Sequence, residues 1–268
     1  FSSRRRHTRY GTVTGVQTCA LPISGLAIAF LVTLVLPAEM GKMKAKPAFS
    51  SMFSKSKAIN LLSLARFFLF GARDVWFVVA LPVFLEASLG WSFWEIGGFL
   101  GLWVIGYGIV QASAPSLRKL WGQSSTPGPG VVQFWSALLT SIPALIAVAL
   151  WRDVDVWVAI TAGLTAFGVV FAMNSSIHSY MVLAYTDQEN VSMNVGFYYM
   201  ANASGRLVGT LLSGAVFMLG RGPTEGMQAC LFVSSILVLL SWLSSLQLPT
   251  VRQFASDEND SVMVGTNR

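Results

Sequence analysis

Six long apolar segments restrict what this chain can fold into. They cover approximately residues 58–85, 93–114, 131–151, 156–184, 191–219 and 227–248, and a shorter apolar run, 25–37, precedes them. A helix needs about 20 apolar residues to cross the hydrocarbon core of a bilayer, which is about 30 Å thick. Because each of the six segments is long enough, the sequence predicts an all-α integral membrane protein.

Composition supports this class and excludes others. Of the residues, 54% are hydrophobic and only 11% are charged, and the mean hydropathy is +0.61, whereas soluble domains have about 25% charged residues. The net charge of +6 comes from cations that lie between apolar runs, which argues against nucleic-acid binding. The two cysteines, Cys19 and Cys230, form no metal-binding motif. We therefore predict no cofactor and no metal.

The first 23 residues have an unusual origin. The strings SSRRRHTR and TGVQTCALPI are in-frame translations of two parts of a common sequencing-library adapter, separated by a spacer of index length. We therefore expect residues 1–23 to be translated adapter rather than native protein, although with 25–36 they resemble a signal peptide. Excluding their four arginines lowers the net charge from +6 to +2. The native chain is then expected to begin inside a helix that ends at residue 37.

The positions of the cations predict the orientation in the membrane. Residues 38–57 contain five lysines, and the next loop expected on the same side contains Arg118 and Lys119, whereas the loops expected on the opposite side contain only Arg152 and Arg221. Because short cytoplasmic loops retain Lys and Arg, the basic loop 38–57 and the carboxyl terminus are expected in the cytoplasm. A partial helix (24–37), this central loop, a six-helix unit (58–249) and a disordered cytoplasmic tail (250–268) match the second half of a six-plus-six transporter.

Four charged residues lie inside the apolar segments: Arg66, Arg73, Asp74 and Arg206. A charge that faces lipid at a helix centre costs roughly 2.5 to 3.5 kcal/mol, so these residues are expected to pair or to line a wet cavity. Arg66 and Arg73 are seven residues apart and therefore share a helix face. Asp74 is the natural partner for one arginine and a candidate for proton coupling. A purely structural Arg73–Asp74 ion pair remains the alternative.

Two further segments carry rows of polar residues at helical spacing. One row contains Asn174, Ser175, His178 and Ser179, and the next contains Asn194, Tyr198 and Asn202, with Tyr199 beside it. Three helices would thus present polar faces at a similar depth, as expected for a midplane site. A hydrogen-bonded core histidine is the alternative for His178, and plain packing is the alternative for the tyrosines.

The sequence thus predicts one site. The candidate substrate-binding residues are Arg66, Arg73, Arg206, Asn174, His178, Tyr198 and Asn202, and the candidates for proton coupling are Asp74 and His178. Arginine stays charged at any accessible pH and binds tetrahedral oxyanions through two nitrogens, so the site favours an anionic substrate.

Small residues recur four positions apart in two of the segments. Gly97 and Gly101 form one row, and Gly205, Gly209 and Ser213 form the other. This spacing predicts close packing between membrane helices. It does not predict a dinucleotide loop, because no strand precedes the glycines.

Four stretches of sequence resemble a known family. They are FSKSKAINLLSLARFFLFGARDVWFVVALPVFL, GWSFWEIGGFLGLWVIGYGIVQASAP, NSSIHSYMVLAYT and MNVGFYYMANASGRLVGTLLSG. They resemble the major facilitator transporters of the organoarsenical-efflux type, the ArsJ family, and the resemblance extends over residues 42–249. It implies a twelve-helix inner-membrane exporter of 1-arseno-3-phosphoglycerate, the arsenate ester that a glyceraldehyde-3-phosphate dehydrogenase makes from arsenate.

This resemblance sets limits and leaves alternatives. The chain lacks most of the family's amino-terminal half, so we expect no transport by this chain alone. A carrier of another organic anion or of a sugar phosphate would have the same fold. A membrane-embedded enzyme with His178 as a general base is the rival from another class. It lacks a second ionisable partner on that helix and a nucleophile motif, so we expect a transporter and no enzyme.

Overall fold

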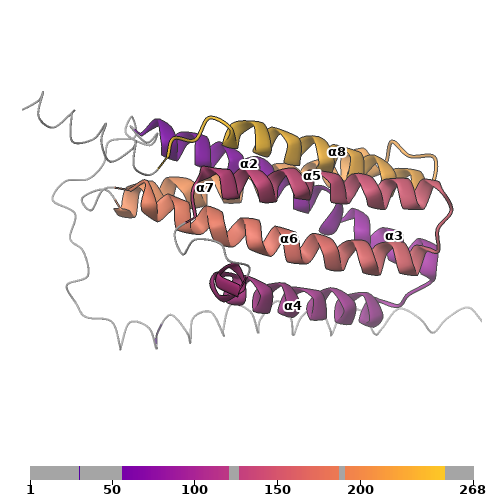
Figure 1. The fold of residues 1–268 in the computed structure, drawn as a ribbon. Helices are drawn as coiled ribbons and strands as arrows, with labels where there is room; N and C mark the ends of the chain where they lie inside the picture. The colour runs from indigo at the N-terminus through magenta and orange to yellow at the C-terminus, as the bar shows by residue number, and fades with distance from the viewer. Residues whose placement is uncertain (1–29, 31–55, 121–126, 187–190, 251–268) are drawn as a thin grey trace, which may run out of the picture. The chain divides into compact units, whose positions relative to one another are not determined.

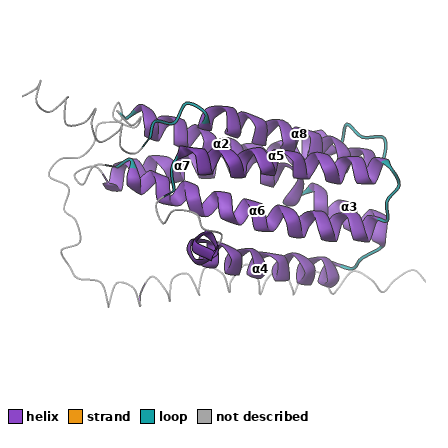
Figure 2. Ribbon diagram, in the orientation of Figure 1, coloured by secondary structure: helices purple, strands orange, loops and turns teal. Residues whose placement is uncertain are grey.

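The computed structural model describes residues 30, 56–120, 127–186 and 191–250, which are mostly helical (Figure 1). Seven helices follow one another: α2 (Lys57–Phe77), α3 (Ala80–Leu89), α4 (Phe93–Leu120), α5 (Pro129–Trp151), α6 (Val156–Ala184), α7 (Val191–Phe217) and α8 (Pro223–Ser245). Figure 2 shows helices and loops, and no strand, in this described part. The prediction of an all-α chain is confirmed there.

Several predictions lie outside the described residues. They concern the adapter-like residues 1–23, the partial helix 24–37 apart from the helical Phe30, most of the basic loop 38–57, and the tail 251–268. All of the helices α2 to α8 belong to the unit Phe49–Arg268.

Five stretches are long and apolar enough to cross a membrane. They are Lys57–Leu89, Phe93–Leu120, Pro129–Trp151, Val156–Ala184 and Pro223–Ser245. The sequence predicted a sixth, and α7 has the length but is not among the five. Its polar residues, Asn194, Asn202 and Arg206 among them, lower its hydropathy. The described chain is thus helical, with elements long and apolar enough to cross a membrane.

The first predicted span, 58–85, corresponds to one candidate membrane span, Lys57–Leu89, but its helix is interrupted. A turn at Val78 and Val79, whose backbone stays in the right-handed helical region, separates α2 from α3. Pro82 explains the break, because proline has no amide hydrogen and its ring collides with the carbonyl group four residues earlier. The amide of Ala80 donates instead to Ser213 Oγ of α7, at 3.1 Å. The hydroxyl group thereby satisfies a backbone donor that the break leaves free.

Helices α2 and α7 approach closely where both contain glycine. A Cβ atom at Gly209 would lie 2.5 Å from the Gly71 carbonyl oxygen, and one at Gly205 would collide with the Phe67 carbonyl oxygen. The predicted close packing by this row is confirmed, and it fixes the height at which α7 crosses α2.

The same prediction for Gly97 and Gly101 is wrong within the described structure. No described residue lies within 4 Å of a Cβ atom placed at either glycine. The reason is that α4 packs mainly against α6 and α3, and of its residues only Ile96, Ala114 and Arg118 are buried. These two glycines lie on a part of α4 that no described helix covers.

Serine hydroxyl groups join α8 to α2. Ser234 Oγ donates to the Ala72 carbonyl oxygen at 2.7 Å, and Ser241 Oγ donates to the Ala65 carbonyl oxygen at 2.8 Å. The two contacts are two helical turns apart on each helix and run in opposite directions along the chain, so the helices are antiparallel. Hydrogen bonds of this kind hold membrane helices together, because lipid offers no competing partner. They fix the part of α2 that carries Arg66 and Arg73.

Candidate functional site

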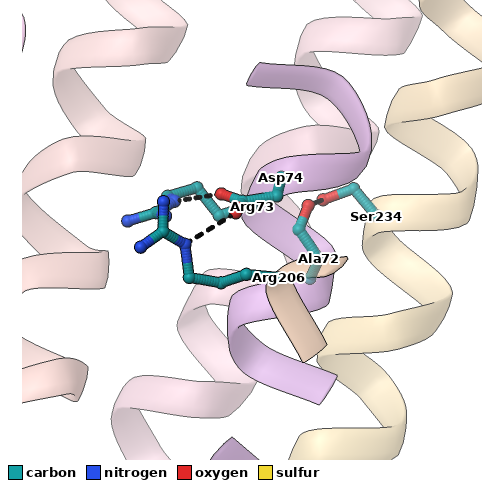
Figure 3. A network of polar contacts seen from close by, with 5 residues as sticks. All are labelled: Ala72, Arg73, Asp74, Arg206 and Ser234. Atoms are coloured by element: carbon teal, nitrogen blue, oxygen red, sulfur yellow. Dashed lines mark hydrogen bonds and ion pairs between the residues drawn. The ribbon is translucent and has the colours of Figure 1, made fainter. Parts of the chain in front are cut away.

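A carboxylate on α2 holds two arginines from different helices. Asp74 Oδ1 accepts a hydrogen bond from Arg73 Nε at 2.6 Å, and Asp74 Oδ2 accepts one from Arg206 Nε of α7 at 3.0 Å (Figure 3). The sequence predicted one partner for Asp74, and the structure gives it two. The three residues form what we call the Asp74 cluster.

The close crossing of α2 and α7 positions this cluster. Gly205, which contacts the backbone of α2, directly precedes Arg206, so the crossing places the arginine beside Asp74. On the other side of α2, Ser234 bonds the carbonyl group of Ala72, next to Arg73 (Figure 3). The backbone around the cluster is therefore held from two neighbouring helices.

The cluster is open on one side. The side chain of Asp74 is 1% exposed, whereas those of Arg73 and Arg206 are 13% and 55% exposed. Each arginine bonds Asp74 through Nε, and among the described residues the terminal nitrogens have no hydrogen-bond partner. Figure 3 shows both guanidinium groups on the same side of Asp74. One carboxylate balances one of the two charges, so a net positive charge faces the open side.

Arg66 has a different environment. It is 3% exposed, and one terminal nitrogen, Nη1, donates to the carbonyl oxygen and to Oγ of Ser175, both at 3.1 Å. Its guanidinium carbon lies 4.1 Å from the centroid of the Phe70 ring and 5.0 Å from that of Tyr198. No described carboxylate lies within ion-pair distance of it. Aromatic faces and one serine support the charge, since cations are attracted to ring faces.

Two buried residues next to Arg66 carry polar atoms without partners. His178 and Tyr198 are both 0% exposed, and both interact electrostatically with Arg66. Among the described residues, Arg66 Nε and both ring nitrogens of His178 have no hydrogen-bond partner, and the Tyr198 hydroxyl group lies near Ser179 and Arg66 without a well-formed hydrogen bond to either. Most buried polar atoms in proteins are hydrogen-bonded. Arg66, Ser175, His178 and Tyr198 form what we call the Arg66 cluster.

The Phe70 ring lies between the two clusters. The guanidinium carbon of Arg73 is 5.0 Å from its centroid, so Arg66 and Arg73 both lie over this ring. The two arginines therefore share a face of α2, as their spacing predicts. Phe171 of α6 packs edge-on against Phe70, at a centroid distance of 5.1 Å. The ring thus contacts an enclosed cation and a partly open one.

The two remaining predicted site residues, Asn174 and Asn202, form no hydrogen bond with the arginines in the described structure. Asn174 pairs instead with Ser136 of α5, its Nδ2 donating at 3.0 Å, so its amide is used in helix packing. Asn202 is partly buried, and its Oδ1 has no hydrogen-bond partner among the described residues. Of the seven predicted substrate-binding residues, the described contacts thus bring five into two adjoining clusters: Arg66, His178 and Tyr198 in one, and Arg73 and Arg206 in the other.

Sequence reasoning missed the aromatic residues of the site. Phe70 and Phe171 contact the guanidinium groups, and Tyr107 of α4 interacts electrostatically with Arg66. The spacing offered a clue, because Phe70 is four residues after Arg66 and three before Arg73, on the same helix face. In such an apolar segment this position does not stand out from the other phenylalanines.

Two further features of the described part of the chain, its acidic and metal-ligating side chains and a groove, do not add to the clusters. No group of three His, Cys, Asp or Glu side chains there could hold a metal ion. A groove of about 350 Å³ lies between α4 and α6, with Trp103, Tyr107 and Leu164 among its lining residues. The groove is almost entirely apolar and no arginine lines it, so it does not serve the chemistry of the two clusters.

Comparisons with protein-family models and with curated proteins find no match for this chain.

Proposed function

We propose that the chain is the carboxy-terminal half of a twelve-helix major facilitator transporter that resembles the ArsJ family and exports an organoarsenical anion, 1-arseno-3-phosphoglycerate. The observation that carries the anion part of the proposal is an excess of cations in the helical bundle. Arg73 and Arg206 share one carboxylate, that of Asp74, and Arg66 has no described carboxylate partner. A second negative group is needed to balance them, and a transported anion supplies it.

The Asp74 cluster is the proposed contact point for that anion. Arg73 and Arg206 are each fixed through Nε. Their four terminal NH₂ groups remain free to donate to the oxygens of a phosphoryl, arsenyl or carboxyl group. Guanidinium groups bind such oxyanions through paired hydrogen bonds. Because Asp74 already orders both arginines, little side-chain entropy is lost when the anion binds.

The exposure of α4 and α7 supports a two-half transporter. Arg206 is 55% exposed, and most of α4 is not covered by any described helix. An amino-terminal half placed against these helices would enclose the anion between the halves, as in alternating-access transporters. We propose an inner-membrane location with a cytoplasmic carboxyl terminus, a transporter rather than an enzyme, and a functional partnership with a glyceraldehyde-3-phosphate dehydrogenase.

A carrier of another organic anion or of a sugar phosphate is the second candidate. The same two arginines favour it, because their terminal nitrogens recognise any tetrahedral oxyanion. Growth of arsenate-sensitive cells distinguishes the two. The intact gene is expressed alone, together with a glyceraldehyde-3-phosphate dehydrogenase, and as an Arg206→Gln variant with the dehydrogenase.

We expect resistance to arsenate only when both proteins are present, and we expect Arg206→Gln to abolish it. An Arg221→Gln variant, in the exposed loop before α8, should retain resistance and serves as the matched control. Absence of resistance together with uptake of a sugar phosphate would instead favour the second candidate. Resistance unaffected by Arg206→Gln would contradict the proposed site.

A further inference from the structure

The Arg66 cluster differs from the proposed transport site in being closed. Arg66 is 3% exposed, and His178 and Tyr198 are 0% exposed, whereas the arginines of the Asp74 cluster are partly open. The Phe70 ring packs on the Arg66 guanidinium group, at 4.1 Å from its carbon to the ring centroid. An organic substrate that must enter and leave has no open route to Arg66 in this conformation. The cluster therefore needs an explanation of its own.

Its polar atoms define what it can bind. Arg66 Nε is a donor, the Tyr198 hydroxyl group is a donor, and a neutral histidine has one N–H group. All three residues are buried, and among the described residues none of these atoms has a well-formed hydrogen bond, although the Tyr198 hydroxyl group lies near Ser179 and Arg66. The Arg66 guanidinium carbon lies 5.0 Å from the centroid of the Tyr198 ring, and Arg66 bonds Ser175, which lies one helical turn before His178 on the same face of α6.

The charge of the Arg66 cluster favours a negatively charged ligand. The full positive charge of Arg66 is not paired with a carboxylate among the described residues, and the nearby charge of Arg73 repels it across Phe70. The acceptors that Arg66 does have, on Ser175, are neutral. A water molecule would accept a hydrogen bond from one of these donors, but it would leave the positive charge of Arg66 unbalanced.

We infer that the Arg66 cluster is a binding site for a small inorganic anion of the size of chloride, held by Arg66, His178 and Tyr198. The anion accepts hydrogen bonds from the three donors and balances the buried guanidinium charge. It is a structural counter-ion, distinct from the organic anion at the Asp74 cluster. The inference does not depend on which organic anion the protein transports.

Thermal unfolding of the intact protein in detergent tests this site. Sodium chloride is titrated at constant ionic strength against sodium gluconate, whose anion is too large for the cluster. Since a ligand that binds only the folded state raises the unfolding midpoint in a saturable way, we expect saturation with chloride and no such rise with gluconate. Coinciding curves in the unmodified protein would overturn the inference.

A conservative variant locates the effect. Tyr198→Phe keeps the ring that packs on Arg66 and removes only the hydroxyl donor, so the half-saturating chloride concentration should rise about tenfold. Tyr180→Phe makes the same chemical change at a residue that is 39% exposed, and it should leave the chloride response unchanged. If Tyr198→Phe does not fold, His178→Leu removes a different donor and should weaken chloride binding by a similar factor. Unchanged chloride responses in the folded variants would overturn the inference.

A further titration separates this site from the substrate site. Arg206→Gln should keep the chloride response while it loses stabilisation by 3-phosphoglycerate, a stable three-carbon anion. A chloride response without any effect of 3-phosphoglycerate would support the counter-ion and count against the proposed substrate site. If 3-phosphoglycerate competed with chloride in the unmodified protein, the Arg66 cluster would belong to the substrate, and the counter-ion would be excluded.

Discussion

Two arginines on one face of α2 have opposite surroundings. Arg73 shares a buried carboxylate with Arg206 and points toward an open side, whereas Arg66, two turns earlier, is enclosed by aromatic rings and has no described carboxylate partner. Helical periodicity brings them to the same face, but the neighbouring helices decide their chemistry. We propose that the carboxylate with two arginines prepares an exchangeable anion site and that the enclosed arginine binds a resident counter-ion.

The largest effect is expected from Asp74→Asn. The substitution keeps the shape but removes the charge that two guanidinium groups share, and breaking a buried ion pair in this way costs about 3 to 5 kcal/mol of folding stability. Chemical unfolding in detergent measures the loss. Asp155→Asn is the matched control, because Asp155 caps the start of α6 and asparagine caps equally well.

The comparison becomes sharper if the Asp74→Asn protein remains folded. Its chloride response should stay that of the unmodified protein, because Asp74 makes no contact with the Arg66 cluster in the described structure. Equal stability of the Asp74→Asn and Asp155→Asn proteins would mean that the ion pairs of Asp74 contribute little.

A smaller loss is expected from Gly205→Ala. The added methyl group would meet the Phe67 carbonyl oxygen and push α7 away from α2, at a cost of about 1 to 3 kcal/mol. The displacement should also weaken binding of 3-phosphoglycerate, because Arg206 follows Gly205 directly. Gly214→Ala in the same helix meets no described atom within 4 Å and should be neutral or slightly stabilising. Similar unfolding curves for the two variants would argue against a close crossing.

The smallest effect is expected from Ser175→Ala. The variant removes one of two acceptors from Arg66 and leaves the Ser175 carbonyl oxygen in place, so about 1 kcal/mol of stability should be lost. Ser141→Ala, at an exposed serine that bonds only within its own helix, should change stability by less than about 0.5 kcal/mol. Added chloride should reduce the Ser175→Ala deficit, since the anion also stabilises Arg66. A deficit that chloride does not change would count against this role.

Much of the fold could be predicted from the sequence because lipid imposes a simple rule. Apolar segments of spanning length predicted α5, α6 and α8 to within four residues, and the spacing of Gly205 and Gly209 predicted the contact with α2. Helix α4 begins as predicted but continues to Leu120, so Arg118 and Lys119 lie in its last turn and not in a loop. The break at Val78 was missed, although Pro82 marks it. Its position depends on Ser213 of another helix, which completes the backbone hydrogen bonding.

The candidate site was predictable in its charges but not in its grouping. Arginine inside an apolar segment is conspicuous, so Arg66, Arg73 and Arg206 could be identified directly. Their division into an open pair and an enclosed single charge depends on the rotation of α6 and α7, which the sequence does not specify. For the same reason Asn174, which has the spacing of a site residue, turns out to bond Ser136.

Binding of 3-phosphoglycerate to the purified intact protein, measured by isothermal titration calorimetry, tests the central claim most directly. The claim is that Arg73 and Arg206, held by one aspartate, present their free nitrogens to an anion. Arg206→Gln should weaken binding at least about tenfold, because charge-assisted hydrogen bonds are lost, and Arg221→Gln should bind like the unmodified protein. Equal affinities of the Arg206→Gln and Arg221→Gln proteins would contradict the claim.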